Sequence, residues 1–347
     1  MKQILKHAVG IDVAQKELVV CLGCIYDDFH IDILSSKTFI NSLKGFSALM
    51  LWVQKHKLEL QDIYFVMEAT GVYHQPLAYH LDQHNLKVNI VLPNKISNYM
   101  RTLDIKTITD HTAAQAITRF GLERKLDNWN RPKEIYLRLK QLTRERDQLI
   151  IERTHSKNQL HAEKSEAFPN PSAIRRVNER IKLLNKQEKQ ITNEIESLIH
   201  ADKQVKNSVD LICSIPGIGI VTAAIVLAET NGFELITNRR QLASYAGFDI
   251  KEKQSGTSIK GKSRISKKGN KFLRKAMYMP SLSAIQCDSR ARTTFSRLVS
   301  RHGIKMKAGI AVQRKLLEMT FTIFKTRRPY DKNFLQKTNL ENPYEKN

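Results

Sequence analysis

The sequence contains few cysteines. There are four in 347 residues, at Cys21, Cys24, Cys213 and Cys287. So few cannot form a disulfide framework in a chain of this size, which indicates a reducing compartment. Cys21 and Cys24 have the spacing of half a zinc site. Because no second cysteine pair follows, we interpret them as small residues within a strand.

Long hydrophobic runs are also missing. The most apolar stretch, Ile218–Ala228, is too short to span a bilayer and continues into polar sequence. Residues 1–7 contain no long apolar region, so we expect no cleaved secretory signal. These features predict a cytoplasmic, nucleoid-associated protein.

Acidic residues are scarce relative to basic ones. Lys and Arg number 57 against 34 Asp and Glu, which gives a formal net charge of +23 and a pI near 9.8. The positive electrostatic potential of such a chain would attract DNA, RNA or an anionic membrane surface. Because no segment is long enough to enter a membrane, we expect a nucleic acid as partner. The length allows two or three domains with cores of ordinary size.

The positive charge is densest between residues 251 and 275, where Glu252 is the single acid. The ten cations are Lys251, Lys253, Lys260, Lys262, Arg264, Lys267, Lys268, Lys271, Arg274 and Lys275. Glycines interrupt this segment and permit close backbone approach to a ligand. A solvated basic loop is the alternative interpretation. The combination of cations and glycines favours contact with a phosphodiester backbone.

Short apolar runs alternate with helical patterns in the first part of the chain. Strands are predicted at 7–13, 18–22, 37–40, 63–68 and 88–93, and helices at 43–56 and 76–83. Hairpins come first and strand–helix alternation follows. This order predicts a mixed α/β sheet domain over residues 1–130.

A heptad-like pattern begins near Ile135 and predicts an antiparallel coiled-coil arm of two helices over residues 131–203. Prolines at 169 and 171 separate the two helices. The apolar positions are Ile135, Leu139, Leu142 and Leu149, then Ile174, Val177, Ile181, Leu184, Ile191, Ile195 and Leu198, with Glu188 at one otherwise apolar position. The basic surface of the arm is either a solvated face or a track for nucleic acid, and both interpretations stay open. A coiled coil can also pair two chains.

Residues 204–330 predict a mainly α-helical C-terminal domain, and residues 331–347 a polar tail. Helices are predicted at 221–229, 240–246, 271–284 and 307–324. Ile215–Gly219 resembles the hairpin of helix–hairpin–helix modules, in which Gly217 and Gly219 would present backbone N–H groups to a phosphate. The alternative is an ordinary helix start with Pro and Gly serving local geometry.

Three carboxylates occupy notable places in this basic chain. Asp12 lies on the first predicted strand, Glu68 ends a later strand, and Asp110 opens a helical stretch. Side chains at neighbouring strand ends can converge, and carboxylate oxygens hold Mg²⁺. The alternatives are an N-cap role for Asp110 and a surface position at a turn for Glu68.

The chain resembles the DEDD transposases of insertion sequences. The matching residues are Gly10-Ile11-Asp12, Glu68 to Tyr73, Thr109-Asp110, Ile215 to Gly219, Ala246-Gly247-Phe248, Ser255-Gly256 and Lys267 to Arg274. These motifs span nearly the whole chain in the family's order. The resemblance implies a RuvC-like, RNase H-fold N-terminal domain and a C-terminal transposase domain.

The resemblance also implies a mechanism and partners. Ser255 would be the nucleophile that forms a phosphoserine bond to DNA, with Asp12, Glu68 and Asp110 binding Mg²⁺. Phosphate contacts would come from Gly217, Gly219, Lys260, Arg264, Lys267, Lys268, Asn270 and Arg274. The partners would be a bridge or seeker guide RNA encoded by the element, donor DNA and target DNA. The assembly would be a tetramer made of two dimers.

The chain departs from the family at one carboxylate. The pattern Thr-Asp-x-x-Asp-Ala reads here Thr109-Asp110-His111-Thr112-Ala113-Ala114, so Ala113 stands at the fourth carboxylate position. One fewer oxygen ligand weakens a Mg²⁺ site. Either the chain is inactivated or three carboxylates suffice. Asp104 is too far upstream to substitute, and His111 would face elsewhere on the helix.

Two other functions agree with the residues. One is a resolvase-like metal-dependent nuclease, in which water attacks at the carboxylates and Ser255 only contacts phosphate. The other is a non-catalytic protein that assembles RNA and DNA, as the alanine at position 113 suggests. The nuclease predicts DNA cleavage without Ser255, whereas the assembly protein predicts salt-sensitive binding with no Mg²⁺-dependent product.

Overall fold

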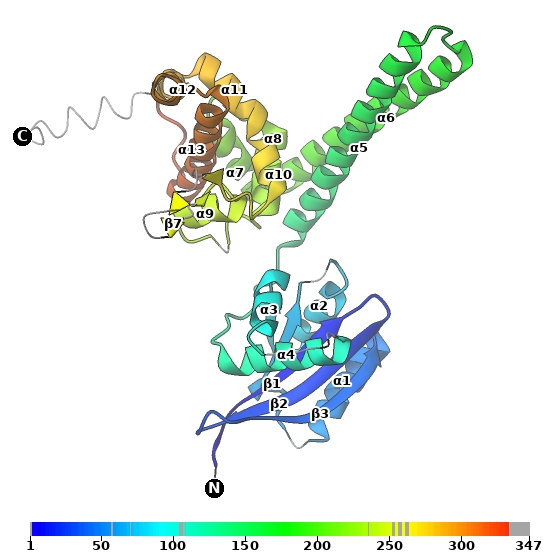
Figure 1. Cartoon of the computed structure of the whole chain (residues 1–347), viewed down its shortest axis with the longest axis vertical. Coiled ribbons are helices and arrows are strands. Elements are labelled where there is room, and N and C mark those ends of the chain that lie inside the picture. Colours follow the sequence, from blue (N-terminus) through cyan, green and yellow to red (C-terminus); the bar gives the residue numbers. More distant parts are fainter. Residues whose placement is uncertain are drawn as a thin grey trace, which may run out of the picture. The chain divides into compact units, whose positions relative to one another are not determined.

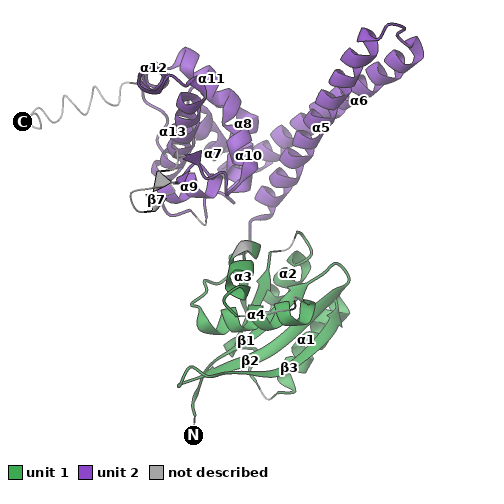
Figure 2. Cartoon of the chain, viewed as in Figure 1, with its two compact units in different colours: residues 1–131 green, residues 132–347 purple. Residues whose placement is uncertain are grey.

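The computed structural model describes residues 2–56, 58–69, 71–103, 107, 109–234, 236–251, 254–255, 259–260 and 264–332. The chain divides into two compact units, residues 1–131 (unit 1) and 132–347 (unit 2) (Figure 2). Within the described residues, no helix is long and apolar enough to cross a membrane.

Unit 1 is built on a mixed five-stranded sheet with the order β3-β2-β1-β4-β5 (Figure 1). The strands are β1 (Ile4–Val13), β2 (Glu17–Tyr26), β3 (Ile31–Ile40), β4 (Ile63–Glu68) and β5 (Lys87–Val91). The first three strands pair antiparallel, whereas β4 and β5 run parallel to β1. The expected α/β class of this region is confirmed. Strand β3 is longer than the predicted 37–40. Its first residues pair with β2 at the sheet edge, where none of residues 31–38 is buried enough to give an apolar run.

Helices cover both faces of this sheet. They are α1 (Leu43–Gln54), a 3-10 turn at Leu60–Asp62, α2 (Gln75–Gln83), α3 (Pro93–Met100) and α4 (Asp110–Glu123). Successive strand residues point to opposite faces. Val9 and Ile11 pack in one cluster with residues of α1 and α2, whereas the intervening Gly10 meets α4 on the other face. Asp12 continues the α4 side of this alternation.

Gly10 allows α4 to lie directly on the sheet. Its backbone N–H donates to Thr118 Oγ1 at 3.1 Å, and that hydroxyl donates to Cys21 O and Ala114 O. A Cβ at residue 10 would lie 2.3 Å from Thr118 N and 2.6 Å from Ala114 O. A side chain here would therefore push α4, which begins with Asp110, away from β1.

We expect Gly10→Ala to destabilise unit 1 by about 3 kcal/mol, because the added methyl overlaps backbone atoms that cannot move independently. Urea unfolding measures the change. Gly309→Ala is the control, since a Cβ there has no atom within 4 Å. Removing a glycine from a helix interior should stabilise by about 0.5–1 kcal/mol. Equal effects of the two changes would contradict the close approach of α4.

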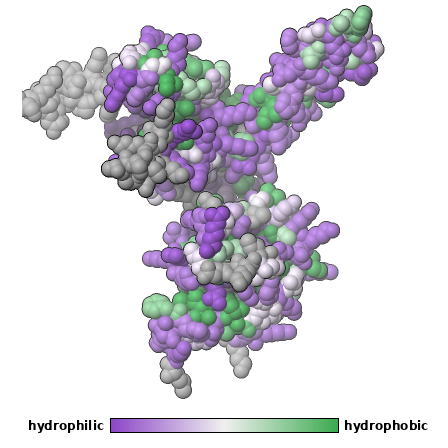
Figure 3. Space-filling view, viewed as in Figure 1, coloured by the Kyte–Doolittle hydropathy of each residue, from purple (hydrophilic) through white to green (hydrophobic). Residues whose placement is uncertain are grey.

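Unit 2 begins with two long helices, α5 (Glu134–Ser165) and α6 (Pro171–Ala201), which pack side by side as an arm with a mainly hydrophilic surface (Figures 1 and 3). Asn170 caps α6 by accepting from the backbone N–H groups of Ser172 and Ala173. The predicted apolar positions Val177, Ile181, Leu184, Ile191 and Ile195 are buried. The coiled-coil geometry of the pair remains a prediction.

Glu188 interrupts this apolar stripe but has partners. Its carboxylate accepts from Arg146 Nη2 at 2.6 Å and from Arg153 Nη1, both on α5. Two arginines of the predicted basic surface therefore neutralise a charge within the arm. They are less available for a nucleic-acid backbone than the sequence suggests.

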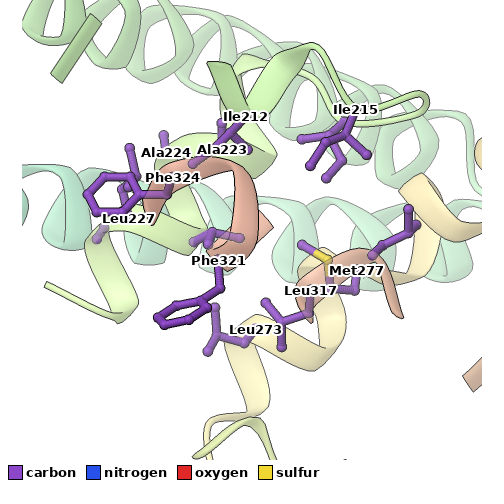
Figure 4. Close-up of a cluster of buried hydrophobic side chains, with 14 of the residues drawn as sticks. Ile212, Ile215, Ala223, Ala224, Leu227, Leu273, Met277, Leu317, Phe321 and Phe324 are labelled. Carbon is purple, nitrogen blue, oxygen red and sulfur yellow. The ribbon is translucent and has the colours of Figure 1, made fainter. Parts of the chain in front are cut away.

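The described remainder of unit 2 is mainly helical around one core (Figure 4). Its helices are α7 (Lys203–Cys213), α8 (Ile220–Glu229), α9 (Arg239–Ala246), α10 (Lys271–Ala276), α11 (Tyr278–Cys287), α12 (Ser289–His302) and α13 (Lys305–Thr326). Figure 4 shows side chains of α8, α10 and α13 meeting in this core. The same core includes Leu139 and Ile195 from the base of the arm. The arm base and the helices after it are thus packed together.

Unit 2 differs from the predicted helices at three places. The predicted helix 271–284 is divided at Met277, because Pro280 lacks the N–H that would bond to Ala276 and its ring crowds that carbonyl. Helices α7 and α12 were not predicted from the sequence. Helix α12 buries only Ala291, so it shows little apolar period, whereas α7 buries Val205, Val209 and Ile212 at helical spacing that the sequence did contain.

Candidate functional site

Asp12 and Glu68 lie at the same end of two adjoining strands. The parallel register pairs Ile11 of β1 with Met67 of β4, so Asp12 and Glu68 follow as neighbours where these strands end. Asp110 is the first residue of α4, which packs on β1 and β2. The sheet register and the close approach of α4 bring the three predicted carboxylates toward one another.

The electrostatics of Asp12 reflect this convergence. Burial, then the negative charge of Asp110 and that of Glu68, together raise the pKa of the Asp12 carboxyl to about 6. An isolated aspartate on a surface would not show the last two effects, since charges act on each other only at short range in salt solution. A carboxyl whose ionisation is opposed by burial and by two other carboxylates is a candidate functional group.

The three carboxylates converge without closing around a point. Among the described residues, no three His, Cys, Asp or Glu side chains lie close enough together to hold a metal ion. The donor set nevertheless fits a hard divalent cation, which binds carboxylate oxygens. A cation there would also offset the repulsion that raises the pKa of Asp12. Asp12, Glu68 and Asp110 are thus the residues that would hold it.

Thr109, and not Asp110, is the N-cap of α4. Thr109 Oγ1 accepts from the Thr112 backbone N–H at 3.2 Å, and Thr112 Oγ1 accepts from the Thr109 N–H at 2.8 Å. This capping box satisfies the helix start by itself. The N-cap role considered for Asp110 is therefore wrong, and its carboxylate is not used for capping.

Ala113 follows Asp110 by one helical turn. Residues three apart lie on the same face of a helix, so residue 113 shares a face of α4 with Asp110. Ala113 is half-buried. His111 is exposed, in agreement with the expectation that it faces elsewhere. Asp104 lies outside the described residues. Within α4, position 113 is where a further carboxylate would join the group.

The basic segment forms a hairpin. Strands β6 (Ile250–Lys251) and β9 (Arg264–Ile265) pair antiparallel, and β7 (Gln254–Ser255) pairs with β8 (Ile259–Lys260) further out. Ser255 is thus placed opposite Ile259, and Lys260 opposite Gln254. The side chains of Ser255 and Lys260 lie outside what the structure describes. So do Ser258 and Ser263, which composition alone would make rival candidates for the nucleophile.

The last strand of the hairpin and the residues after it present cations to solvent. Arg264, Lys267 and Lys268 are exposed. The Ser266 hydroxyl donates to Asp249 Oδ1 at 2.6 Å, so this serine has a structural partner. The segment wraps the end of α9, where the Lys267 N–H donates to Gly247 O. The exposed cations are therefore carried on a backbone that is itself held in place.

Two other predicted nucleic-acid contacts have local roles. Arg274 Nη1 donates to Ala246 O at 2.7 Å and to Gly269 O at 3.3 Å. Asn270 caps α10 through Oδ1, and its Nδ2 donates to Glu229 Oε2 at 2.6 Å. Both side chains thus shape the segment, whatever else they contact.

Gly217 and Gly219 differ in what their backbones require. Gly217 has a φ of +89°, and a Cβ there would lie 2.6 Å from Pro280 O, so packing against α11 requires glycine. Gly219 precedes α8 and would meet no atom within 4 Å. No side chain caps α8 at this residue. The backbone N–H groups that follow Gly219 are therefore better candidates for binding a phosphate than those at Gly217.

Two parts of the chain match family models of transposases. A family model described as a transposase of the DEDD IS110 type matches residues 9–169, and one described as the transposase IS116/IS110/IS902 family matches residues 209–296. A pilin gene-inverting protein of Moraxella bovis is 31% identical over 94% of this chain and 98% of its own length. The chain belongs to the IS110 family of DEDD transposases.

Two further similarities are more limited. An uncharacterized 43.6 kDa protein of insertion element IS110 in Streptomyces coelicolor is 28% identical over 38% of this chain and 32% of its own length. The solved structure of T. thermophilus RuvC in complex with a Holliday junction substrate is 14% identical, with a TM-score of 0.26, and covers 35% of this chain and 99% of that chain.

This transposase also has a buried charge that sequence reasoning missed. Glu229 ends α8 and is 3% exposed. Burial raises the pKa of its carboxyl, but hydrogen bonds from Arg144 and Asn270 and the charge of Lys140 lower the pKa more, and it stays below its ordinary value. The available signal was a single acid at the end of the apolar run 218–228.

Two of the four cysteines, Cys21 and Cys24, lie within a strand, as the sequence predicts. Cys21 and Cys24 are free, fully buried and part of β2. A histidine pair, His80 and His84, lies one turn apart on α2 and its end, with ring centroids 4.6 Å apart. In the described part of the chain, neither pair belongs to a group of three metal-ligating side chains.

Proposed function

We propose that this transposase cuts and rejoins DNA through a covalent serine intermediate. The observation that supports it best is the convergence of Asp12, Glu68 and Asp110 at one end of the sheet, with the pKa of Asp12 raised to about 6. Three carboxylates that repel one another are suited to a divalent cation, Mg²⁺ in this proposal. When bound, the cation would neutralise charge on the reacting phosphate.

Ser255 supplies the nucleophile in this proposal. Its hydroxyl oxygen attacks the phosphorus of a DNA phosphodiester and loses its proton. The new bond joins serine oxygen to phosphorus, and the bond to the departing DNA oxygen breaks, with that oxygen taking up a proton. The bond energy is kept for rejoining. Exposed cations of the segment, Arg264, Lys267 and Lys268, hold phosphates and offset the developing charge.

The partners are proposed from the family resemblance and the charge of the chain. A guide RNA encoded by the element would pair with donor and target DNA, and unit 1 would be RuvC-like. The chains would assemble as a dimer of dimers, with the arm helices α5 and α6 pairing chains. The net charge of +23 supports binding of several nucleic-acid strands at once.

The experiment that tests the nucleophile is a covalent-adduct assay. The protein with its co-purified RNA is incubated with labelled donor and target DNA in Mg²⁺, and protein–DNA adducts are scored on a denaturing gel. Ser255→Ala is expected to remove the adduct completely, because alanine has no oxygen to bond to phosphorus. Ser266→Ala is the matched control, since that hydroxyl already donates to Asp249. Both changes are repeated in an Ala113→Asp background.

Other outcomes would favour the two alternatives. DNA cut by the Ser255→Ala protein, without adduct, would show a nuclease that uses water. Tight, salt-sensitive binding without any Mg²⁺-dependent product in either background would show an assembly protein. An adduct that survives Ser255→Ala but is lost with Ser266→Ala would show that Ser266, and not Ser255, is the nucleophile.

A further inference from the structure

A buried ionic network joins the arm to the basic segment within unit 2. The carboxylate of Glu229 accepts from Arg144 Nε at 2.8 Å and Nη2 at 3.1 Å, and Lys140 Nζ lies 4.0 Å away. Both cations belong to α5 of the arm. The same carboxylate accepts from Asn270 Nδ2 at 2.6 Å. One side chain of α8 therefore contacts the arm and the end of the basic segment together.

Asn270 is the point where this network meets the segment. Its Oδ1 accepts from the backbone N–H groups of Phe272 and Leu273 and so starts α10. Its own N–H donates to Tyr245 O at 2.7 Å, and the Tyr245 hydroxyl donates to Glu229 O at 3.0 Å. The side-chain oxygen, the side-chain nitrogen and the backbone N–H of Asn270 are thus all hydrogen-bonded, which sets its place from three sides.

Helix α10 contacts the arm at further points. The Arg144 guanidinium carbon lies 4.5 Å from the centroid of the Phe272 ring. Lys275 of α10 forms an ion pair with Asp147 of α5. A cavity of about 300 Å³ remains beside these contacts, bordered by α5, α8, α10 and α11. The start of α10 is thus held to the arm by side chains around this open space.

A buried charge pair is poor evidence of stabilisation on its own. Desolvation of Glu229 and Arg144 offsets much of their attraction, and apolar residues of similar volume often serve as well. The pair instead fixes the orientation of the Glu229 carboxylate. Arg144 binds the carboxylate through two parallel hydrogen bonds, and this geometry leaves Glu229 Oε2 aimed at Asn270.

We propose that Glu229 is a positioning residue of the transposase. Through Asn270 it holds residues 264–274 of the basic segment in one place relative to the base of the arm. The exposed cations Lys267 and Lys268 would then meet phosphates with their backbone already placed, which lowers the barrier to reaction. This inference rests on the proposed function, in which that segment contacts the reacting DNA.

Two variants separate positioning from capping. Asn270→Ser keeps a residue that caps helices well but is too short to reach Glu229. Glu229→Gln keeps the shape and removes the charge that orients Arg144. Glu188→Gln is the matched control, because Glu188 also pairs with two arginines of α5 yet contacts only the arm. All variants are made in a background that forms the DNA adduct.

We expect Asn270→Ser and Glu229→Gln each to slow adduct formation at saturating DNA by about tenfold, with DNA affinity changed by less than about twofold. Glu188→Gln should change the rate by less than about twofold, even where it lowers the melting temperature as much. An unchanged rate in both test variants would overturn the proposal. So would an equal loss in the Glu188→Gln control.

A second measurement does not depend on activity. Hydrogen exchange reports opening of the backbone N–H groups of Lys267 and Asn270, which donate to Gly247 O and Tyr245 O. Both test variants should speed this exchange by about tenfold, and the control should leave it unchanged. If no protein forms an adduct, the proposed function fails, and this exchange still decides the positioning role. Equal exchange in all proteins would refute it.

Discussion

Replacing Asp12 with asparagine is expected to abolish Mg²⁺-dependent DNA cleavage and joining, by about a thousandfold or more, while stabilising the folded protein at pH 7.5. Asparagine keeps the size of the side chain but offers one neutral oxygen in place of a carboxylate. The cation then loses a ligand at the centre of the group. The repulsion from Asp110 and Glu68 also disappears.

The stability change has a defined pH window. The pKa of Asp12 is raised from 3.8 to about 6, so between these values the folded protein binds more protons than the unfolded chain. Stability therefore falls as pH rises through this window, and the full penalty is present above pH 6. A shift of about two units corresponds to about 3 kcal/mol. Because Asp12 is only half-buried, solvent screening reduces this to about 1–2 kcal/mol.

Urea unfolding without divalent cation, at pH 4 and pH 7.5, measures the effect. The Asp12→Asn protein should exceed the unaltered protein in stability at pH 7.5 and approach it at pH 4. Asp27→Asn, in the exposed turn after β2, is the control and should show neither difference. Added Mg²⁺ should stabilise the unaltered protein more than the Asp12→Asn protein. A stability gain that is the same at both pH values would contradict the repulsion.

Ala113→Asp is the second change with a large expected effect. It places a carboxylate one helical turn after Asp110, on the same face of α4, without disturbing the capping box of Thr109 and Thr112. Affinity for Mg²⁺ should rise by about tenfold or more, since carboxylate number tunes such sites. Without the cation the variant should be less stable, because a further negative charge joins the group.

The adduct assay decides what this change means for activity. We expect adducts from the Ala113→Asp protein at about ten times the yield of the unaltered protein. Ala113→Asn is the matched control, with equal size and no charge. Adducts from the Ala113→Asp protein alone would mean that the unaltered chain stops at the binding stage. Equal yields from all three would mean that three carboxylates suffice, and no adduct from any would contradict the serine mechanism.

The sequence by itself was informative where a pattern is local. Strand and helix periods predicted most elements of unit 1, and the heptad-like stripe predicted α5 and α6 with a break at the prolines. These patterns work because an apolar side chain must reach a core, and its spacing reveals the element that carries it. The motifs that indicated the family are likewise short runs of sequence. Guide RNA, oligomer and the serine nucleophile remain predictions.

Only the tertiary structure decided the roles that depend on distant partners. Thr109 caps α4, which leaves the charge of Asp110 to raise the pKa of Asp12. Gly10 allows that helix to lie on the sheet, and Asn270 meets a carboxylate 41 residues earlier in the chain. None of these contacts has a sequence period, because each joins elements that come together only when the core packs. Composition showed that the chain is basic. Packing determined which cations are exposed and which, like Arg144, neutralise a buried charge.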